Sequence, residues 1–322
     1  MPEASTPAVS VVISTYNRSA DLAELVDALD AQTFPADRFE IVVIDDGSQD
    51  ETPELLARLG NHPRLHIRSA TNPTNAGPAV GRNHGVRLAT GPLVAFTDDD
   101  CRPSPVWLAE IVAAMDGRDD RVVVGRVEPE PGHDIGPFTR TLVVRDANYF
   151  QTANTAVPRA LFDEIGGFDE SYRRPGGEDT DLGLRLLEHG AEAVFASDAL
   201  VHHAVSTNDL RGALRKARRW IDIGRVVRRH PAVRRELMHR RVFWKRSHPP
   251  TLLALLGLAA ALLWPFALVA VLPWVYARVV TNPPLHRSRR EHLLSLPGVF
   301  LVDATEVATM VRASLRGRTL IL

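Results

Sequence analysis

The stretch 93-LVAFTDDD-100 is the one around which the rest of the sequence can be interpreted. The apolar run Leu93–Phe96 has the length and composition of a buried strand, and the carboxylates of Asp98, Asp99 and Asp100 follow it closely. A strand that ends in acids presents them at the edge of a sheet, where ligands of open α/β folds bind. A divalent cation would relieve the repulsion between them, and all-oxygen ligands suit Mg²⁺ or Mn²⁺. The alternative is a solvated acidic turn, which is the commoner meaning of a charged cluster.

Length and charge restrict the class of protein. With 322 residues, the chain can form one large α/β domain and an appendage, or two modest domains. Its net charge of -1 hides about fourteen Arg and Lys residues within residues 211–246, which indicate a surface for anions. The single cysteine, Cys101, excludes an internal disulfide and a Cys-based zinc site. Residues 1–8 have no apolar core, so we expect a disordered N-terminus, no signal peptide and a domain in the cytosol.

Apolar runs alternate with amphipathic segments through the first two hundred residues. Strands are predicted at residues 9–13, 41–44, 65–67, 93–96, 122–124 and 193–195. Helices are predicted at residues 19–29, 50–59, 78–89, 105–115 and 179–189, and residues 128–137 should form a mobile loop. This alternation is typical of a parallel sheet with right-handed crossovers.

Polar loops follow three of these strands and should meet at one edge of the sheet. They contain Tyr16 and Asn17, Asp45 and Asp46, and the three acids from Asp98. No Gly-x-Gly-x-x-Gly follows the first strand, and the chain has no Gly-x-x-x-x-Gly-Lys-Ser/Thr motif. Phosphates, if they bind here, must therefore be held by metal and arginine.

A second acidic group precedes the helix predicted at residues 179–189. Glu178, Asp179 and Asp181 would occupy its N-terminus, where the helix dipole favours negative charge. Simple capping explains one of these acids well and three less well. His202 and His203 follow the last predicted strand, and a lone histidine is more often structural than a ligand.

Taken together, the chain resembles the family 2 glycosyltransferases of the GT-A fold over roughly residues 9–205. The resemblance implies an α/β domain with a mixed, mainly parallel sheet flanked by helices. It divides that domain into a nucleotide-binding half, residues 9–101, and an acceptor half, residues 102–205. The order and spacing of the matching stretches carry it, and they lie at residues 9–18, 41–48, 75–83, 96–101, 166–170 and 178–186.

The resemblance also implies roles for individual residues. Asp98 and Asp100 would hold the metal with His202, whereas Asp99 is ambiguous because either neighbouring pair could supply the ligands. Asp179 would be the catalytic base, paired with Glu178. The residues implied in binding the nucleotide sugar are Ser14, Tyr16, Asn17, Asp45, Asp46, Arg82, Asp98, Asp99 and Asn154.

The activity implied is transfer of a sugar, UDP-linked in our expectation, from a nucleoside diphosphate to an acceptor hydroxyl, with inversion and a divalent metal. Processive members carry Gln-x-x-Arg-Trp after the base; here residues 216–220 read Lys-Ala-Arg-Arg-Trp, which favours transfer of a single sugar. Two alternatives remain. A sugar-phosphate nucleotidyltransferase would use the same acids and release pyrophosphate, and a membrane scaffold would retain an inactive fold.

The C-terminal third indicates a membrane. Residues 206–250 would form a basic amphipathic linker, and the nearly uncharged residues 252–280 could cross a bilayer once. Pro265 and Pro273 could instead kink this stretch into a hairpin. Residues 293–311 would be a returning span or a surface helix. We therefore predict binding of residues 211–322 to membrane lipids and not to nucleic acid, a catalytic domain facing the cytoplasm, and a lipid-linked or saccharide acceptor in cell-envelope polysaccharide or glycolipid synthesis.

Overall fold

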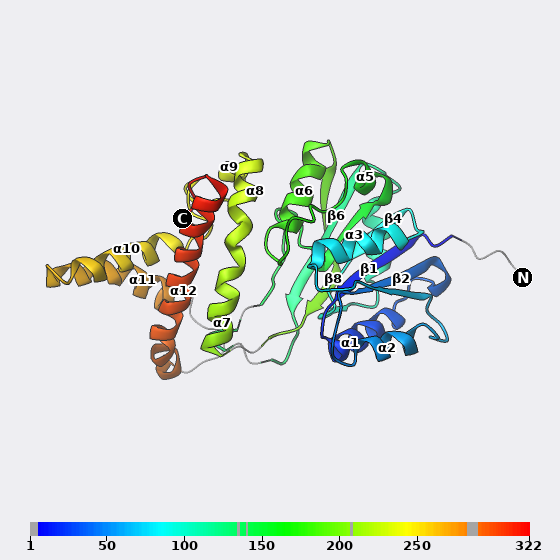
Figure 1. Cartoon of the computed structure of the whole chain (residues 1–322), viewed down its shortest axis with the longest axis horizontal. Helices are drawn as coiled ribbons and strands as arrows, with labels where there is room; N and C mark the ends of the chain where they lie inside the picture. The colour runs from blue at the N-terminus through cyan, green and yellow to red at the C-terminus, as the bar shows by residue number, and fades with distance from the viewer. Residues whose placement is uncertain (1–5, 134–135, 140, 207–208, 282–288) are drawn as a thin grey trace, which may run out of the picture. The chain divides into compact units, whose positions relative to one another are not determined.

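The computed structural model describes residues 6–133, 136–139, 141–206, 209–281 and 289–322 (Figure 1). The chain divides into two compact units. The first contains Met1–Pro131 and Thr141–Ala204, and the second contains Gly132–Arg140 and Val205–Leu322.

A single eight-stranded sheet organises the first unit, in the order β3-β2-β1-β4-β7-β6-β8-β5. Strands β1 to β4 pair in parallel, whereas β7 runs antiparallel to β4 and β6, and β5 antiparallel to β8. The predicted mixed, mainly parallel sheet is confirmed. The strands are β1 (Val9–Thr15), β2 (Phe39–Asp45), β3 (Ile67–Thr71), β4 (Leu93–Phe96), β5 (Cys101–Pro103), β6 (Arg121–Pro129), β7 (Thr155–Pro158) and β8 (Glu192–His203).

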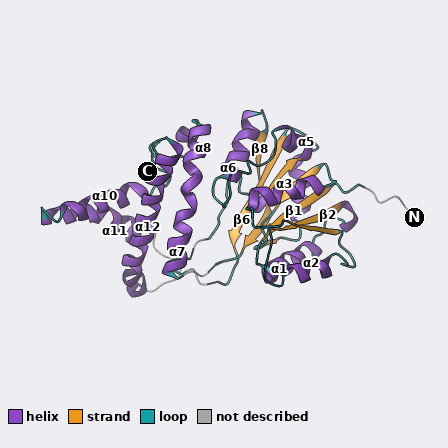
Figure 2. Ribbon diagram, in the orientation of Figure 1, coloured by secondary structure: helices purple, strands orange, loops and turns teal. Residues whose placement is uncertain are grey.

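Helices cover both faces of this sheet, with α1 and α2 on one face and α3 and α5 on the other (Figure 2). In α1, Leu22, Leu25, Val26 and Leu29 recur at helical spacing and are buried, so the helix turns one apolar stripe toward the sheet. The helices of the unit are α1 (Ser19–Asp30), α2 (Thr52–Leu59), α3 (Pro78–Leu88), α4 (Trp107–Met115), α5 (Arg159–Glu164) and α6 (Glu178–Glu188), with short 3-10 turns η1 (Ala36–Arg38) and η2 (Thr152–Asn154).

The observed elements differ from the predicted ones where pairing with a distant strand determines whether a strand forms and where it ends. The strand expected at residues 65–67 lies at β3, and β5, β7 and α5 were not predicted. Strand β8 continues well beyond residue 195 because it pairs with β6 on both sides of a bulge between Gly125 and Arg126. In the predicted loop at residues 128–137, β6 runs to Pro129, and residues 134–135 lie outside the described residues. Of the predicted disordered N-terminus, residues 1–5 also lie outside them, while Ala8 N donates to Arg38 O (2.7 Å).

The second unit is helical. Helix α12 (Arg289–Gly317) packs beside α7 (Leu210–Ala217), the 3-10 turn η3 (Arg218–Asp222) and α8 (Ile223–Arg229), and α9 (Val233–Glu236) follows α8. The approach of α8 to α12 is close, because a Cβ on Gly224 would lie 2.1 Å from Ala313 O. Among the described residues, one helix, over residues 290–317, is long and apolar enough to cross a membrane by length and composition.

The apolar residues 252–280 do not form the single spanning helix considered above. They fold back as a hairpin of α10 (His248–Ala260), the 3-10 helix η4 (Pro265–Val271), α11 (Leu272–Tyr276) and the π-helical turn η5 (Ala277–Thr281). Helix α10 packs against η4 and α11. Pro265 has no N–H to donate and starts the returning arm, which is why the run breaks there.

Candidate active site

The loops that follow β1 and β2 are joined at the carboxyl edge of the sheet. Asn17 adopts a left-handed backbone (φ 53°), its N–H donates to Ser48 Oγ (2.8 Å), and its Oδ1 accepts from Gln49 N (2.7 Å). Tyr16 precedes it and is 40% exposed, although a phenol ring usually packs. The first two loops predicted to bind the nucleotide therefore lie together, with an aromatic face open to solvent.

Asp45 and Asp46 at the end of β2 have different partners. Asp46 accepts from Asn72 Nδ2 (2.8 Å) and from the backbone N–H groups of residues 76 and 77 (2.9 and 2.8 Å), so it holds the loop before α3. Asp45 Oδ1 accepts from Ser48 N (2.9 Å), whereas its buried Oδ2 has no hydrogen-bond partner among the described residues. Since a buried acceptor without a donor is costly, Asp45 is the carboxylate of this pair that is ready for a ligand.

Helix α3 brings an arginine into the acids. A Cβ on Gly81 would lie 2.2 Å from Ser14 Oγ, so glycine lets α3 approach β1 closely at the predicted nucleotide site. The next residue, Arg82, is buried; its Nη2 contacts Asp98 Oδ1 (2.7 Å) and its Nη1 contacts Glu178 Oε1 (3.4 Å). One guanidinium thus joins the acid after β4 to the first residue of α6.

The other two acids of the triplet share a second arginine. Arg18 Nη1 lies 3.4 Å from Asp99 Oδ1 and forms a close ion pair with Asp100, and Thr15 Oγ1 donates to Asp99 Oδ2 (2.8 Å). Burial raises the pKa of Asp99 to about 7; Arg18 opposes this rise and Asp100 adds to it. The effect of burial on Asp99 therefore outweighs that of the nearby Arg18.

A histidine completes this side of the cluster, and it is His203 instead of the predicted His202. His203 Nε2 lies 3.3 Å from Asp100 Oδ1, and ligand atoms of Asp100, Cys101 and His203 lie within 4.8 Å of one another. In the antiparallel pairing of β5 with β8, Cys101 is opposite His203 and Arg102 is opposite His202. Because successive strand residues point to opposite faces, only one of the two histidines can face Asp100.

The residues present fit a divalent cation at this place. Asp100 and His203 supply a carboxylate and an imidazole donor side by side, a pair that Mn²⁺ or Mg²⁺ accepts more readily than a soft metal does, while Asp98 of the same triplet contacts Arg82 through its Oδ1. The guanidinium of Arg18 is already held between Asp99 and Asp100, which indicates that the carboxylates need a positive charge there. The thiol of Cys101 is a poor candidate, because burial and the nearby acids raise its pKa well above the ordinary value.

The acids at the N-terminus of α6 divide into paired and unpaired groups. Glu178 pairs with Arg82 and its Oε2 accepts from Gly176 N (2.7 Å), and buried Asp181 pairs with Arg185 (2.9 Å). Asp179 is half-buried and has no cation within ion-pair distance among the described residues. Burial, together with the Glu178 carboxylate, raises its pKa to about 7. A carboxyl group with this pKa can accept a proton near neutral pH, as a general base must.

Asn154, predicted to bind the nucleotide sugar, is instead enclosed in the core of the first unit. Its Nδ2 donates to Ala199 O (2.7 Å) and Arg126 O (3.0 Å), and its Oδ1 accepts from Trp107 Nε1 (2.8 Å). The side chain is completely buried and its hydrogen-bonding groups are engaged by the protein. Asn154 therefore links β6, β8 and α4, and it is not offered to a ligand.

Sequence reasoning missed Thr15 and Arg18 as members of the cluster, and it singled out His202 and His203 without deciding which of them lies near the acids. For Arg18 a signal existed, because it lies in the same loop as Tyr16 and Asn17 and brings positive charge to an edge rich in acids. For His203 none existed, since the choice between adjacent histidines depends on the register of two strands about a hundred residues apart.

Comparison with known proteins identifies the family. The model of the family described as Glycosyl transferase family 2 matches residues 10–168, and that of Glycosyl transferase family group 2 matches residues 138–281. The validoxylamine A glucosyltransferase of Streptomyces hygroscopicus subsp. jinggangensis is 31% identical over 284 residues, which cover 76% of this chain and 65% of that protein. The counterpart from subspecies limoneus is covered to 61%, so the chain spans less than two thirds of the length of these relatives.

Solved structures agree on the fold. The mannosyltransferase PcManGT from Pyrobaculum calidifontis, in complex with GDP-Man and Mn²⁺, has a TM-score of 0.59 at 22% identity, covering 97% of this chain and 87% of that one. Residues 1–349 of S. aureus TarS, in complex with UDP-GlcNAc, give 0.54 at 17% identity, covering 97% and 92%. With its sheet order, its cluster of acids and these matches, the chain belongs to the family 2 glycosyltransferases and has their GT-A fold.

Proposed function

We propose that this chain transfers a sugar from a nucleoside diphosphate donor to an acceptor hydroxyl, with residues 9–205 as its catalytic domain. The observation that carries the proposal is the position of Asp179 at the N-terminus of α6. Its carboxyl group accepts from Thr180 N (2.7 Å) and has no ion pair among the described residues, and Arg82 ties the adjacent Glu178 to Asp98. This arrangement combines a base with a cation that can face phosphate. Residues 9–101 would hold the nucleotide and residues 102–205 the acceptor.

The donor would bind along the β1 and β2 loops. Tyr16 would stack on the base, Asp45 Oδ2 would accept a hydrogen bond from base or ribose, and Ser14 and Asn17 would line the same edge. The structural neighbours described above were solved with GDP-Man and with UDP-GlcNAc, which supports a nucleotide sugar as the donor. A UDP-linked sugar remains our prediction.

A divalent cation, Mg²⁺ or Mn²⁺, would be held by Asp98, Asp100 and His203. When bound, it would neutralise the charge of the donor diphosphate. PcManGT was solved in complex with Mn²⁺, which supports a divalent metal as the cofactor. Arg18 would leave the carboxylates when the cation is bound, and Arg82 would balance the charge that develops on the leaving group.

The reaction would be a single displacement with inversion. As the acceptor oxygen forms its bond to the anomeric carbon, the bond from that carbon to the diphosphate oxygen breaks, and the diphosphate takes the electron pair. Asp179 would take the hydroxyl proton, because an acceptor hydroxyl is a poor nucleophile until a base assists it. Glu178, held by Arg82 and Gly176 N, would keep the pKa of Asp179 high.

We propose a lipid-linked or saccharide acceptor at the cell membrane, with the catalytic domain facing the cytoplasm, as in cell-envelope polysaccharide or glycolipid synthesis. The uncharged hairpin of the second unit supports a membrane location.

A panel of nucleotide sugars with Mn²⁺ tests the activity. We expect one donor to raise the melting temperature, since only a ligand that prefers the native state does so, and to release nucleoside diphosphate when acceptor is present. Release of pyrophosphate from a sugar phosphate and a nucleoside triphosphate would instead identify a nucleotidyltransferase. No turnover with any donor would leave an inactive scaffold.

Asp179→Asn should lower turnover by about a hundredfold or more while donor affinity changes little, because the substitution removes only the base. Steady-state kinetics and calorimetric donor titration measure the two effects. Glu188→Gln, at the exposed end of the same helix, is the matched control and should behave as wild type. Turnover of the Asn variant within a few-fold of wild type would exclude Asp179 as the base.

We expect kcat/KM to decrease as the pH falls below neutrality. The base works when deprotonated, so kcat/KM should fall about tenfold per pH unit below pH 7 and level off above it, since the pKa of Asp179 is raised to about 7. The pKa of Asp99 is also raised to about 7, so Asp99→Asn is the control and should keep the acidic limb. A flat profile between pH 5.5 and 8 would contradict the assignment.

Arg18 should compete with the metal in the absence of donor. Removing the guanidinium in Arg18→Ala should tighten Mn²⁺ binding roughly fivefold, as expected for a partly exposed ion pair worth up to about 1 kcal/mol. Asp100→Ala should weaken binding at least tenfold. Electron paramagnetic resonance of free Mn²⁺ measures both, and equal affinities in all three proteins would place the cation elsewhere.

A further inference from the structure

The second unit carries a long uncharged hairpin whose arms pack tightly on each other. From Ser247 to Ala277 the sequence has no Asp, Glu, Lys or Arg. A Cβ on Gly257 in α10 would lie 2.5 Å from the Cβ of Ala270 in η4, so small residues let the arms approach closely. The hairpin is therefore a formed element, and its apolar residues are not simply a loose tail.

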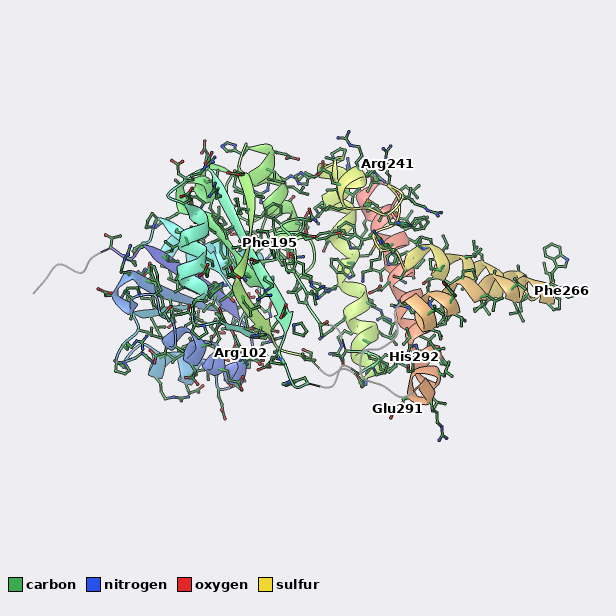
Figure 3. The ribbon with its side chains drawn as sticks, turned by 180° about the vertical axis from the view of Figure 1, so that it is seen from behind. Arg102, Phe195, Arg241, Phe266, Glu291 and His292 are labelled. Carbon is green, nitrogen blue, oxygen red and sulfur yellow. The ribbon has the colours of Figure 1, made fainter. Side chains whose placement is uncertain are left out.

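The end of the hairpin is exposed on all sides. Leu262 is 88% exposed, Leu263 76%, Trp264 67% and Phe266 90%. Figure 3 places Phe266 at the far end of the hairpin, away from Glu291 and His292 of α12. Neighbouring residues of a turn point in different directions, so a protein groove would cover only some of them. An apolar medium surrounds all of them, and the interior of a bilayer is such a medium.

The base of the hairpin is polar and fixed to α12. Asp303 Oδ2 accepts from Trp274 Nε1 (2.8 Å) and Arg278 Nε (2.9 Å), and Glu306 accepts from Lys245 Nζ (3.0 Å). The two acids of α12 that interrupt its apolar sequence are thus buried and paired inside the unit. They hold the hairpin in one orientation to α12.

The neighbours of α12 argue against its crossing a bilayer. Val302 packs with Ala213 and Ala217 of α7, and Gly224 of α8 meets Ala313, so α12 runs beside these helices over most of its length. A helix that crossed would carry that segment with it, although charged side chains are costly inside hydrocarbon. The segment exposes seven arginines, which are Arg211, Arg215, Arg218, Arg219, Arg225, Arg228 and Arg229.

The length of the hairpin suits one leaflet. Helix α10 has 13 residues, which at 1.5 Å per residue is about 20 Å, against about 30 Å for the hydrocarbon core. Part of that length is anchored in the unit, where His248, Thr251 and Ala254 are buried. The exposed end can therefore reach into one leaflet, and it is too short to cross both.

We propose that the end of the hairpin, residues 262–272, inserts into one leaflet of an anionic bilayer, while α12 stays outside the hydrocarbon and the arginines of α7, η3 and α8 bind lipid headgroups. No described segment then crosses the membrane. The attachment does not depend on the catalytic chemistry proposed above.

Flotation of the full chain with lipid vesicles tests the insertion. Wild type should float with phosphatidylcholine vesicles containing phosphatidylglycerol, and less with pure phosphatidylcholine or in 0.5 M NaCl. Leu263→Glu/Phe266→Glu should reduce the bound fraction at least tenfold. The matched control Val106→Glu/Leu187→Glu places two charges at exposed apolar positions of the first unit and should float as wild type.

Two further measurements determine how deeply the hairpin enters the bilayer and on which side of the membrane the two ends of the chain lie. Brominated lipids should quench tryptophan fluorescence in wild type and not in Trp264→Phe. Epitope tags at both ends of the chain should be cleaved by protease from the same side of sealed membranes, whereas a crossing α12 would protect one of them.

Flotation of the hairpin variant equal to that of wild type would overturn the proposal, as would a protected C-terminal tag. A third outcome would also overturn it: light scattering shows a dimer for wild type and a monomer for the hairpin variant, and neither protein binds vesicles. The hairpin would then contact a second copy of the chain. Donor binding by the variant in detergent, at the wild-type level, shows that it is folded. It also separates a failure of membrane insertion from a failure of the proposed activity.

Discussion

The ion pairs of Arg82 are the interaction on which the site depends. A buried guanidinium must be paired, and Arg82 obtains its partners from Asp98 after β4 and from Glu178 at the start of α6, eighty residues later in the chain. Its ring contact with Phe168, 5.6 Å from guanidinium carbon to ring centroid, covers a further side. Because Gly81 lets α3 lie close to β1, this one side chain connects β1, β4 and α6 at the carboxyl edge of the sheet. The pairing holds the first residue of α6, and with it the adjacent Asp179, next to the acid that follows β4.

The carboxyl groups around Arg82 and Arg18 outnumber these two arginines, and this affects the chemistry of the site. Five carboxyl groups, those of Asp98, Asp99, Asp100, Glu178 and Asp179, face the two guanidiniums of Arg18 and Arg82. Burial combined with surplus negative charge raises the pKa of both Asp99 and Asp179 to about 7. The first is next to the carboxylates assigned to a cation and the second is assigned as base. Burial, reinforced by neighbouring carboxylates, thus leaves both groups able to exchange a proton near neutral pH.

The sequence predicts those parts of the fold and site that local pattern controls. Apolar runs ending in polar loops identify the parallel half of the sheet, and three acids before an apolar stripe identify the start of α6. Long-range pairing controls the rest. Strands β5 and β7 are short and have no periodic signal of their own, and their partners decide that they exist. The same register selects His203 over His202. Asn154 appeared available because its partners, Trp107 and the carbonyls of Arg126 and Ala199, are distant in sequence.

Hydropathy alone selects the wrong segment of the second unit as a single spanning helix, because it takes no account of how two acids of α12 are paired. In a one-dimensional profile, Asp303 and Glu306 weaken residues 293–311 as a span and leave residues 252–280 as the better candidate. In three dimensions the acids bind Trp274, Arg278 and Lys245, and so hold the base of the hairpin to α12. Their burial costs free energy that hydrogen bonds and ion pairs offset, and the offset exists only while the hairpin stays folded on α12. A straight helix through residues 252–280 would separate Arg278 from Lys245 by nearly 50 Å, at 1.5 Å for each of 33 residues, and could not serve both acids, which lie one turn apart. The break at Pro265 therefore follows from pairing these charges as much as from the proline itself.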